Sequence, residues 1–207
     1  MMLAIKFLQV LIMPIKILTL ILYLTLPSIA LAAGTISGTV TYRGGATVDA
    51  VVYIEDTAGE FAPPKEHLVM DQKNLTFIPH VMPILIGTTV NFINSDDVLN
   101  NIFTPSWAGR KFNLGTYPKG IVRSFTFDRL GEVVILCNIH PEMEAYILAL
   151  KNPFFAVTDK TGKFTISGVP SGRYTLRTWH EKLKPQTKQI SVMENTTTTV
   201  VDFELIR

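Results

Sequence analysis

Three residues with metal-binding side chains lie close together in the second half of the chain. The apolar run from Val133 to Leu136 leads directly into a short segment that holds Cys137, His140 and Met143. Because a strand end would fix Cys137 and a short loop can turn the other two back toward it, a thiolate, an imidazole and a thioether can converge on one ion. Soft ligands of this kind select copper, so the segment predicts a copper site.

Other metals fit this ligand set less well. Structural zinc sites normally collect four cysteine and histidine ligands, and a thioether is not among them. Iron–sulfur clusters need several cysteines, whereas Cys137 is the only cysteine of the chain. For the same reason no disulfide can form within the chain. The alternative interpretation of Cys137 is a small, inert, buried side chain at a strand end.

The elements that must position these residues are β-strands. From residue 34 onward the sequence has no long helical periodicity, and short β-branched and aromatic runs alternate with Gly, Pro, Asn and Asp. The fold class is therefore predicted to be all-β, and the spacing of the turns suits two sandwiches. The predicted strands are Thr35–Tyr42, Ala50–Glu55, His67–Met70, Thr89–Ile93, Asn101–Phe103, Ile121–Phe127, Glu132–Cys137, Ala145–Leu150, Lys163–Ile166, Arg173–Thr178, Lys188–Val192 and Thr198–Glu204.

The last third of the chain carries a first family resemblance. From Phe155 to Leu176 it reads Phe-Ala-Val-Thr-Asp-Lys-Thr-Gly-Lys-Phe-Thr-Ile-Ser-Gly-Val-Pro-Ser-Gly-Arg-Tyr-Thr-Leu. This segment resembles the second half of the carboxypeptidase regulatory-like family of small β-sandwiches. The first half of that family's pattern is similar to Gly38-Thr-Val-Thr-Tyr-Arg-Gly-Gly followed by Ala50-Val-Val-Tyr-Ile, far upstream in this chain.

The distance between these two halves predicts a nested arrangement. Residues 34–56 and 152–207 would together form one carboxypeptidase regulatory-like sandwich. Residues 66–151 would form a second β-domain inserted into a surface loop, a kind of insertion that folds tolerate. The alternative is two domains in series, in which the N-terminal strands would pair with the middle domain.

The middle segment carries a second resemblance. From about Thr76 to Leu150 the chain resembles a plastocyanin-type cupredoxin of the bacterial methylamine-utilisation-like group. The shared features are Phe77-Ile-Pro, Gly87-Thr-Thr-Val-Asn-Phe-Ile-Asn, the Asn-Ser-Asp turn and the Cys-x-x-His-x-x-Met loop at 137–143. The resemblance implies a Greek-key sandwich that carries one electron on a copper ion. Trp179-His180-Glu181 also matches that group, and we expect His180 to lie where the two sandwiches meet.

One ligand position departs from the cupredoxin pattern. Relatives have a His-Asn pair after the Asn-Ser-Asp turn, and this chain has Asn100-Asn101 there. Blue copper sites use two histidines, a cysteine and a weak axial methionine, so one imidazole is missing. Three alternatives follow for the copper site. Asn100 or water completes it, another histidine such as His80 replaces the missing imidazole, or no metal is bound. An amide oxygen should weaken Cu(II) relative to Cu(I), which predicts a raised potential or a cuprous protein.

The first 32 residues are predicted to be a cleaved signal peptide. Ile17–Leu26 is apolar, Pro27 breaks it, and Ala30-Leu31-Ala32 has the small-x-small pattern of a cleavage site. The run is shorter than the roughly 20 apolar residues that span a bilayer, so an uncleaved anchor is the lesser alternative. Met13 would also begin a complete signal peptide. The mature protein is therefore expected in the periplasm or outside the cell, with no stable membrane span.

Composition narrows the function classes further. Removing residues 1–32 takes away Lys6 and Lys16 and no acidic residue, which leaves 17 basic against 17 acidic residues. With no basic block, nucleic acid is not an expected partner. The sequence shows no nucleophile–base pair and no phosphate-binding glycine loop, so we expect no enzyme. The remaining hypotheses are a copper carrier with an unknown redox or envelope protein partner, and a metal-free binding or structural module.

Overall fold

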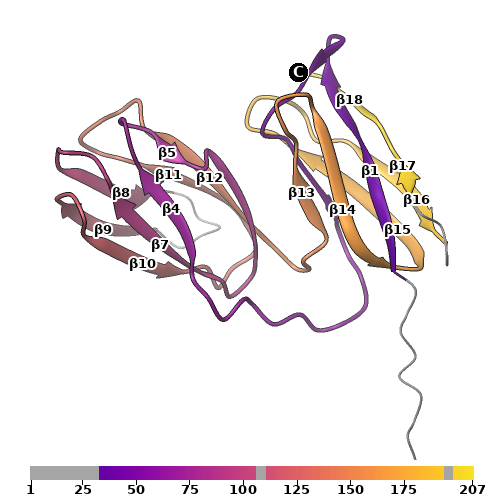
Figure 1. The fold of residues 1–207 in the computed structure, drawn as a ribbon, viewed down its shortest axis with the longest axis horizontal. Coiled ribbons are helices and arrows are strands. Elements are labelled where there is room, and N and C mark those ends of the chain that lie inside the picture. The colour runs from indigo at the N-terminus through magenta and orange to yellow at the C-terminus, as the bar shows by residue number, and fades with distance from the viewer. Residues whose placement is uncertain (1–32, 106–110, 194–197) are drawn as a thin grey trace, which may run out of the picture. The chain divides into compact units, whose positions relative to one another are not determined.

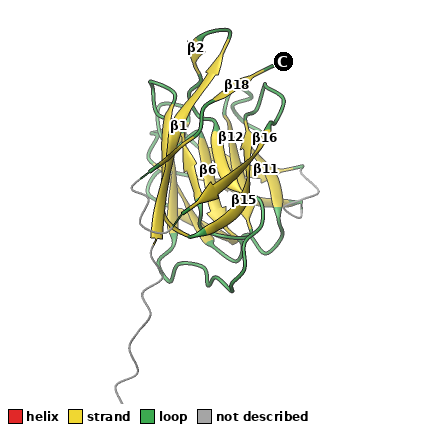
Figure 2. Cartoon of the chain, turned by 90° about the vertical axis from the view of Figure 1, so that its right-hand side faces the viewer, coloured by secondary structure: helices red, strands yellow, loops and turns green. Residues whose placement is uncertain are grey.

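The computed structural model describes residues 33–105, 111–193 and 198–207, and the predicted signal peptide lies outside them. Within these ranges the regular elements are all strands, eighteen in total, and they are shown in Figures 1 and 2. The predicted all-β class is confirmed. The strands form two pairs of sheets, and each pair encloses its own hydrophobic core.

The first pair of sheets contains the segment that resembles a cupredoxin. One sheet has the order β10-β7-β4-β5, in which β4 runs parallel to β7. The other has the order β6-β12-β11-β8-β9, in which β6 runs parallel to β12. The bounds are β4 Leu68–Gln72, β5 Phe77–Ile78, β6 Val81–Leu85, β7 Thr89–Asn94, β8 Asn100–Thr104, β9 Phe112–Tyr117, β10 Val122–Thr126, β11 Gly131–Leu136 and β12 Glu144–Leu150.

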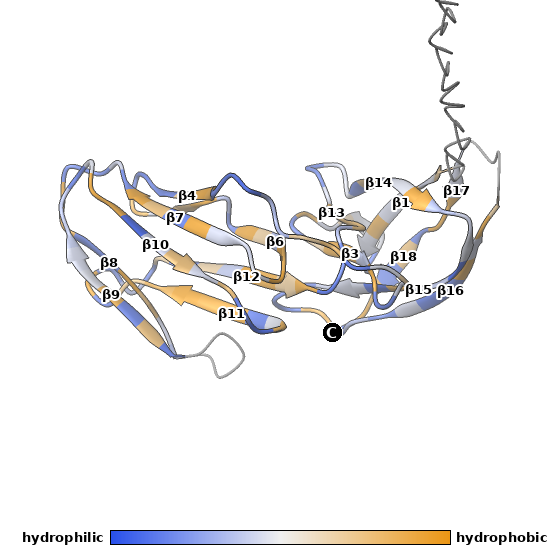
Figure 3. Cartoon of the chain, turned by 90° about the horizontal axis from the view of Figure 1, so that it is seen from below, coloured by the Kyte–Doolittle hydropathy of each residue, from blue (hydrophilic) through white to orange (hydrophobic). Residues whose placement is uncertain are grey.

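Strand periodicity explains the core between these two sheets. In β7 every second residue is buried, so Val90, Phe92 and Asn94 all point inward. In β12 five consecutive residues are buried because both faces of the strand are covered. Ala145 and Ile147 belong to the core between the two sheets, and the alternate residues belong to a separate buried cluster that includes residues of β3. Figure 3 shows that β11, the neighbour of β12, is also largely hydrophobic.

The second pair of sheets joins the start of the described chain to its end. In one sheet β1 pairs antiparallel with β14 and parallel with β17 and β18, and β2 adds to β1. The other sheet has the order β13-β3-β15-β16. The bounds are β1 Ala33–Tyr42, β2 Gly45–Ala46, β3 Val51–Ile54, β13 Phe155–Val157, β14 Lys163–Pro170, β15 Gly172–Trp179, β16 Thr187–Val192, β17 Thr199–Val200 and β18 Phe203–Leu205.

Every predicted strand overlaps an observed one, and the structure adds strands that the sequence analysis did not predict. Among these are β6 and β9. β6 contains Pro83, and as an edge strand it accommodates a residue that has no N–H for a second ladder. β9 contains Gly115 at φ 78°, a backbone conformation outside the normal strand region. The domain boundaries proposed from the sequence stay a prediction.

Candidate metal centre

The predicted ligand loop is the connection between two adjacent antiparallel strands. Cys137 directly follows β11 and Met143 directly precedes β12. The loop is closed by two backbone hydrogen bonds, from Met143 N–H to the carbonyl of His140 (3.0 Å) and from Cys137 N–H to the carbonyl of Met143 (3.4 Å). The three predicted ligands are therefore held in one short hairpin connection, because the two strands are paired up to the loop, where Leu136 faces Glu144.

The structure brings the thiol and the imidazole of this loop together. Cys137 Sγ lies 3.9 Å from His140 Nδ1. Two ligands about 2.3 Å (sulfur) and about 2.0 Å (nitrogen) from one ion, at a trigonal angle of about 120°, are about 3.7 Å apart. The observed distance therefore fits a shared ion. Cys137 is buried and His140 is only half-buried, so the imidazole is the more accessible of the two.

The sulfur of Cys137 also receives a backbone hydrogen bond. Asn101, on the neighbouring strand β8, points its N–H at Cys137 Sγ over 3.4 Å. This contact ties the ligand loop to the strand that carries Asn100. The contact was not predicted from the sequence, because every residue except proline has a backbone N–H and the residue type does not show where it points. The only signal was that Asn101 stands next to the predicted ligand Asn100.

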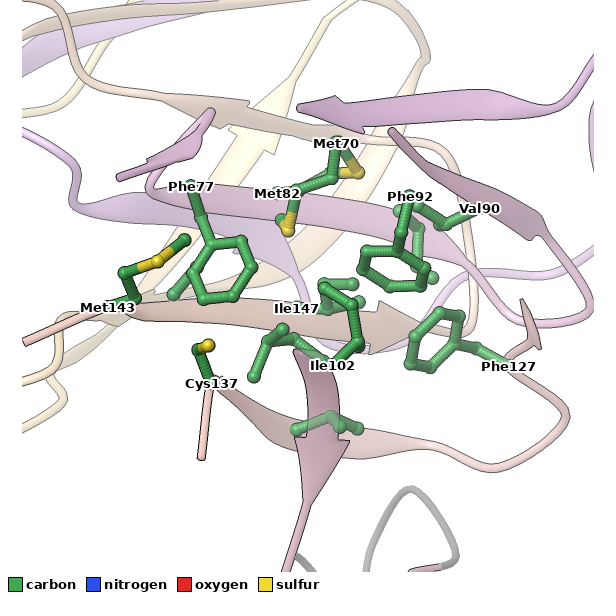
Figure 4. Close-up of a cluster of buried hydrophobic side chains, with 14 of the residues drawn as sticks. Met70, Phe77, Met82, Val90, Phe92, Ile102, Phe127, Cys137, Met143 and Ile147 are labelled. Carbon is green, nitrogen blue, oxygen red and sulfur yellow. The ribbon is translucent and has the colours of Figure 1, made fainter. Parts of the chain in front are cut away.

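Met143 belongs to the same buried cluster as Cys137. Its side chain is 1% exposed. Figure 4 shows Met143 and Cys137 at one end of this cluster, near Phe77. A buried thioether at the end of the ligand loop is available as a soft ligand, and it also fills core volume.

Asn100, the residue at which the resemblance to cupredoxins predicts a histidine, contacts His140 directly. Its side chain is fully buried, and Asn100 Oδ1 lies 2.8 Å from His140 Nδ1. This is a hydrogen-bond distance. Since an amide oxygen only accepts, the His140 ring donates from Nδ1 in this arrangement. Asn100 is thus adjacent to the predicted metal position, but its oxygen is already paired with a predicted ligand.

The composition of this site differs from that of common metal centres. Among the described residues no group of three or more His, Cys, Asp or Glu side chains is placed to hold a metal ion. The candidate centre contributes one cysteine and one histidine to such a group, and its other members are a methionine and an asparagine. It therefore fits copper in its soft, cuprous state better than a metal that needs several imidazoles or carboxylates.

His80, the alternative second imidazole, is engaged elsewhere. Its Nδ1 lies 3.1 Å from the backbone carbonyl of Glu144 and its Nε2 lies 3.3 Å from a carboxylate oxygen of Glu181. Its ring also packs edge-on against Tyr146. Both ring nitrogens already have partners, so this structure provides no nitrogen of His80 for the ligand loop.

The residues that connect the two pairs of sheets flank His180. Glu181 lies within hydrogen-bond distance of His80 Nε2 (3.3 Å), and Trp179 Nε1 donates to Glu132 on β11 over 2.8 Å. His180 Nδ1 instead accepts the backbone N–H of Lys182 (3.0 Å). Burial raises the pKa of Glu181, but hydrogen bonds from Lys182 and His80 outweigh it, and the net pKa is lowered. Burial lowers the pKa of His180.

A buried tyrosine lies near the candidate centre. Tyr117 ends β9 and pairs with Asn100 in the sheet, and its hydroxyl is buried without a hydrogen-bond partner. Burial raises the pKa of Tyr117, the charge of Arg123 lowers it, and the charge of Cys137 raises it further. Tyr117 therefore stays neutral at physiological pH, and its ring belongs to the same buried cluster as Cys137.

Comparison with known proteins finds one matching family model and similar solved structures. Residues 145–206 match the model of the carboxypeptidase regulatory-like domain family. No curated protein shows significant similarity to the whole sequence.

The similar solved structures are copper proteins of the cupredoxin type. A copper-containing nitrite reductase from Thermus scotoductus SA-01 is 25% identical over 47% of this chain and 25% of its own, with a TM-score of 0.41. A reduced mutant of amicyanin is 19% identical over 42% of this chain and 84% of its own, at 0.39. A purple cupredoxin from Nitrosopumilus maritimus is 22% identical over 40% of this chain and 98% of its own, at 0.36. This chain thus resembles cupredoxins over less than half of its length.

Proposed function

We propose that this protein binds one copper ion at Cys137, His140 and Met143, with Asn100 as a weak fourth donor. The single observation that carries the proposal is the 3.9 Å separation of Cys137 Sγ and His140 Nδ1 in a closed hairpin loop. Copper held by such ligands supplies one-electron chemistry or is passed on as cargo. The protein's own contribution is a hydrogen-bonded loop with a buried cysteine sulfur.

The ligand set supports a preference for Cu(I). Two of the four donors are sulfur atoms, one is an imidazole nitrogen and one is an amide oxygen. Replacing an imidazole by an amide oxygen removes a ligand that stabilises Cu(II), whereas the thiolate and the thioether favour Cu(I). We therefore propose a cuprous carrier, or an electron carrier whose potential is higher than that of a two-histidine site.

Access to the proposed site is from the side of His140. Cys137 and Met143 are buried, whereas His140 is half-buried and its neighbour Ile139 is 41% exposed. An ion or an electron would therefore enter through the imidazole edge. The partner on this side would be a redox or envelope protein, as the predicted export of the chain implies. Within residues 33–105, 111–193 and 198–207 no helix is long and apolar enough to cross a membrane.

Anaerobic Cu(I) titration of the purified protein against a chromophoric chelator tests the proposal. We expect one equivalent of Cu(I) to be taken up by the wild type and none by Cys137→Ala. Met193, which is 66% exposed and outside the site, offers the matched control Met193→Leu, which should bind as the wild type does. With Cu(II) we expect at most a weak thiolate charge-transfer band. Failure of the wild type to bind either oxidation state would refute the proposal.

A metal-free binding module is the second candidate, and one observation favours it. The hydrogen bond between His140 Nδ1 and Asn100 Oδ1 (2.8 Å) satisfies both groups without an ion. A site that lost its metal would keep such a contact, since buried polar groups need partners. In that case the same titration returns no uptake, and Cys137→Ala changes only stability.

A further inference from the structure

Asn94, on β7, forms a side-chain hydrogen bond with Asn100. Its side-chain nitrogen donates to the backbone carbonyls of Val98 (2.9 Å) and Tyr117 (3.0 Å). Because carbonyls only accept, these two contacts settle which end of the Asn94 amide is nitrogen. Asn94 Oδ1 must then face the other way, where it accepts from the backbone N–H of Asp96 (3.0 Å) and from Asn100 Nδ2 (3.1 Å).

Asp96 holds the same amide group from a second direction. Its carboxylate accepts from Asn100 Nδ2 (3.0 Å) and from the backbone N–H groups of Asn74 (2.5 Å) and Leu75 (3.2 Å). Asn74 and Leu75 both have φ of 55° and form the tight turn between β4 and β5. Three donors thus converge on one half-buried carboxylate, which links this turn to Asn100.

These contacts determine which atom of Asn100 faces the ligand loop. An ionised carboxylate cannot donate, and Asn94 Oδ1 cannot donate either, so both hydrogens of Asn100 Nδ2 point toward them. The amide oxygen of Asn100 is left facing His140 Nδ1 at 2.8 Å. A rotation of the amide by half a turn would set the oxygen of Asn100 against two acceptors, Asn94 Oδ1 and the Asp96 carboxylate, and would set its NH₂ group against the Nδ1–H of His140.

We propose that Asp96 is a positioning residue that, together with Asn94, presents the oxygen of Asn100 to the ligand loop and so keeps the proton of His140 on Nδ1 in the metal-free protein. An amide oxygen can coordinate a cation, whereas an amide NH₂ group cannot. The hydrogen-bond network therefore turns the side-chain oxygen of Asn100, the atom of the amide group that can coordinate copper, toward the ligand loop. The copper part of this inference rests on the proposed function, and the orientation of the amide does not.

The test reads the tautomer of His140 directly in the metal-free, ¹⁵N-labelled protein at about pH 8, above the ordinary titration range of histidine. Long-range ¹H–¹⁵N spectra separate Nδ1–H from Nε2–H rings. We expect the wild type to show the Nδ1–H form. In Asp96→Ala the amide loses its charged anchor, and we expect the Nε2–H form to appear. Wild-type His140 in the Nε2–H form would overturn the proposal, and this measurement needs no variant to fold.

A neighbouring carboxylate provides the control. Asp97 is exposed and bonds to Lys119 (2.7 Å), so Asp97→Ala should leave the His140 tautomer unchanged. A lower melting temperature of Asp96→Ala with an unchanged tautomer would reduce Asp96 to a structural role and refute the positioning role. Cu(I) titration of the same variants separates the positioning role of Asp96 from the proposal that the loop binds copper. Asp96→Ala should bind about 10- to 100-fold more weakly, the range for loss of a residue that orients a ligand. No uptake by the wild type would count against the copper site alone.

Discussion

The substitution Asn100→His should supply the second imidazole that the resemblance to cupredoxins predicts at this position. Asn100 is fully buried, and its amide lies 2.8 Å from His140 Nδ1, so a ring at this position would lie beside the sulfur and the nitrogen of the ligand loop. The variant would then offer two imidazoles, a thiolate and a thioether, the set that forms blue copper sites. We expect an intense visible thiolate-to-Cu(II) band that is much weaker in the wild type.

The cost and the gain can both be estimated. The Asn100 amide makes three side-chain hydrogen bonds, and an imidazole that faces the ion retains at most one of them. Losing two, at about 1 kcal/mol each, makes the metal-free variant about 2 kcal/mol less stable. The larger ring in a packed site adds a further cost of about 1–3 kcal/mol. In return, Cu(II) affinity should rise by at least the roughly 10- to 100-fold that orienting residues alone contribute.

That gain has an electrochemical signature. If Cu(II) binds 10- to 100-fold more tightly while Cu(I) is unchanged, the reduction potential falls by about 60–120 mV, since a tenfold change corresponds to about 59 mV for one electron. Thermal unfolding should show that Asn100→His depends more on Cu(II) for its stability than the wild type does. The metal-free variant melts lower, and saturation with copper at about 100 times its dissociation constant recovers roughly 2.7 kcal/mol.

The assay is absorbance and thermal unfolding of wild type, Asn100→His and a control, each with and without Cu(II). Asn113 is exposed on β9 and provides the control Asn113→His, which adds a histidine outside the ligand loop. Only Asn100→His should gain the band. A folded Asn100→His variant with neither a visible band nor a copper-dependent melting temperature would show that residue 100 does not face the metal position.

Three further changes test the site and the fold. Met143→Leu conserves volume, so it should lower the free energy of unfolding, measured in urea, by less than about 1.5 kcal/mol. Its Cu(I) affinity in chelator competition should nevertheless fall more than about tenfold. An equal loss of affinity in Met193→Leu would refute the thioether's role. Gly38→Ala drives a Cβ into a facing backbone carbonyl and should cost about 1–3 kcal/mol in urea unfolding. Gly45→Ala, whose Cβ would have no neighbour closer than 3.6 Å, should be near neutral, and equal effects would contradict the packing. Burial lowers the pKa of His180 below its ordinary 6.5, so the unfolded chain binds more protons and the free energy of unfolding falls as pH drops through 6.5. In His180→Gln the midpoint of urea unfolding should depend less on pH in that window. An unchanged pH dependence would refute the assignment.

Local sequence patterns predicted most of the strands. The alternating run Thr89–Ile93 and the apolar run Ala145–Leu150 were predicted as strands, and both lie within observed strands. β6 was missed because it contains Pro83, which is acceptable only at a sheet edge. Whether a strand lies at an edge depends on its partners, and a local pattern does not contain that information.

The metal loop was predicted from residue types, and its copper binding remains a prediction. Cys137, His140 and Met143 are close in sequence, so a short hairpin necessarily keeps them near one another. Asn100 was found by its place in a resembling motif. Asn94 and Asp96 were noted only as parts of the Asn-Ser-Asp turn. Their contacts with Asn100 were not predicted, because these depend on which atoms of several side chains meet, and residue types alone do not specify hydrogen-bond direction.

The sequence by itself determined that the chain is built of strands and that a thiol, an imidazole and a thioether share one short loop. Both properties depend on neighbouring residues, whose periodicity and spacing can be read directly. Only the tertiary structure decided that β1 pairs with strands from the last third of the chain, and that the oxygen of Asn100 faces His140. These are long-range contacts, set by the packing of whole sheets and by a hydrogen-bond network that spans β7, the turn before β5 and the ligand loop.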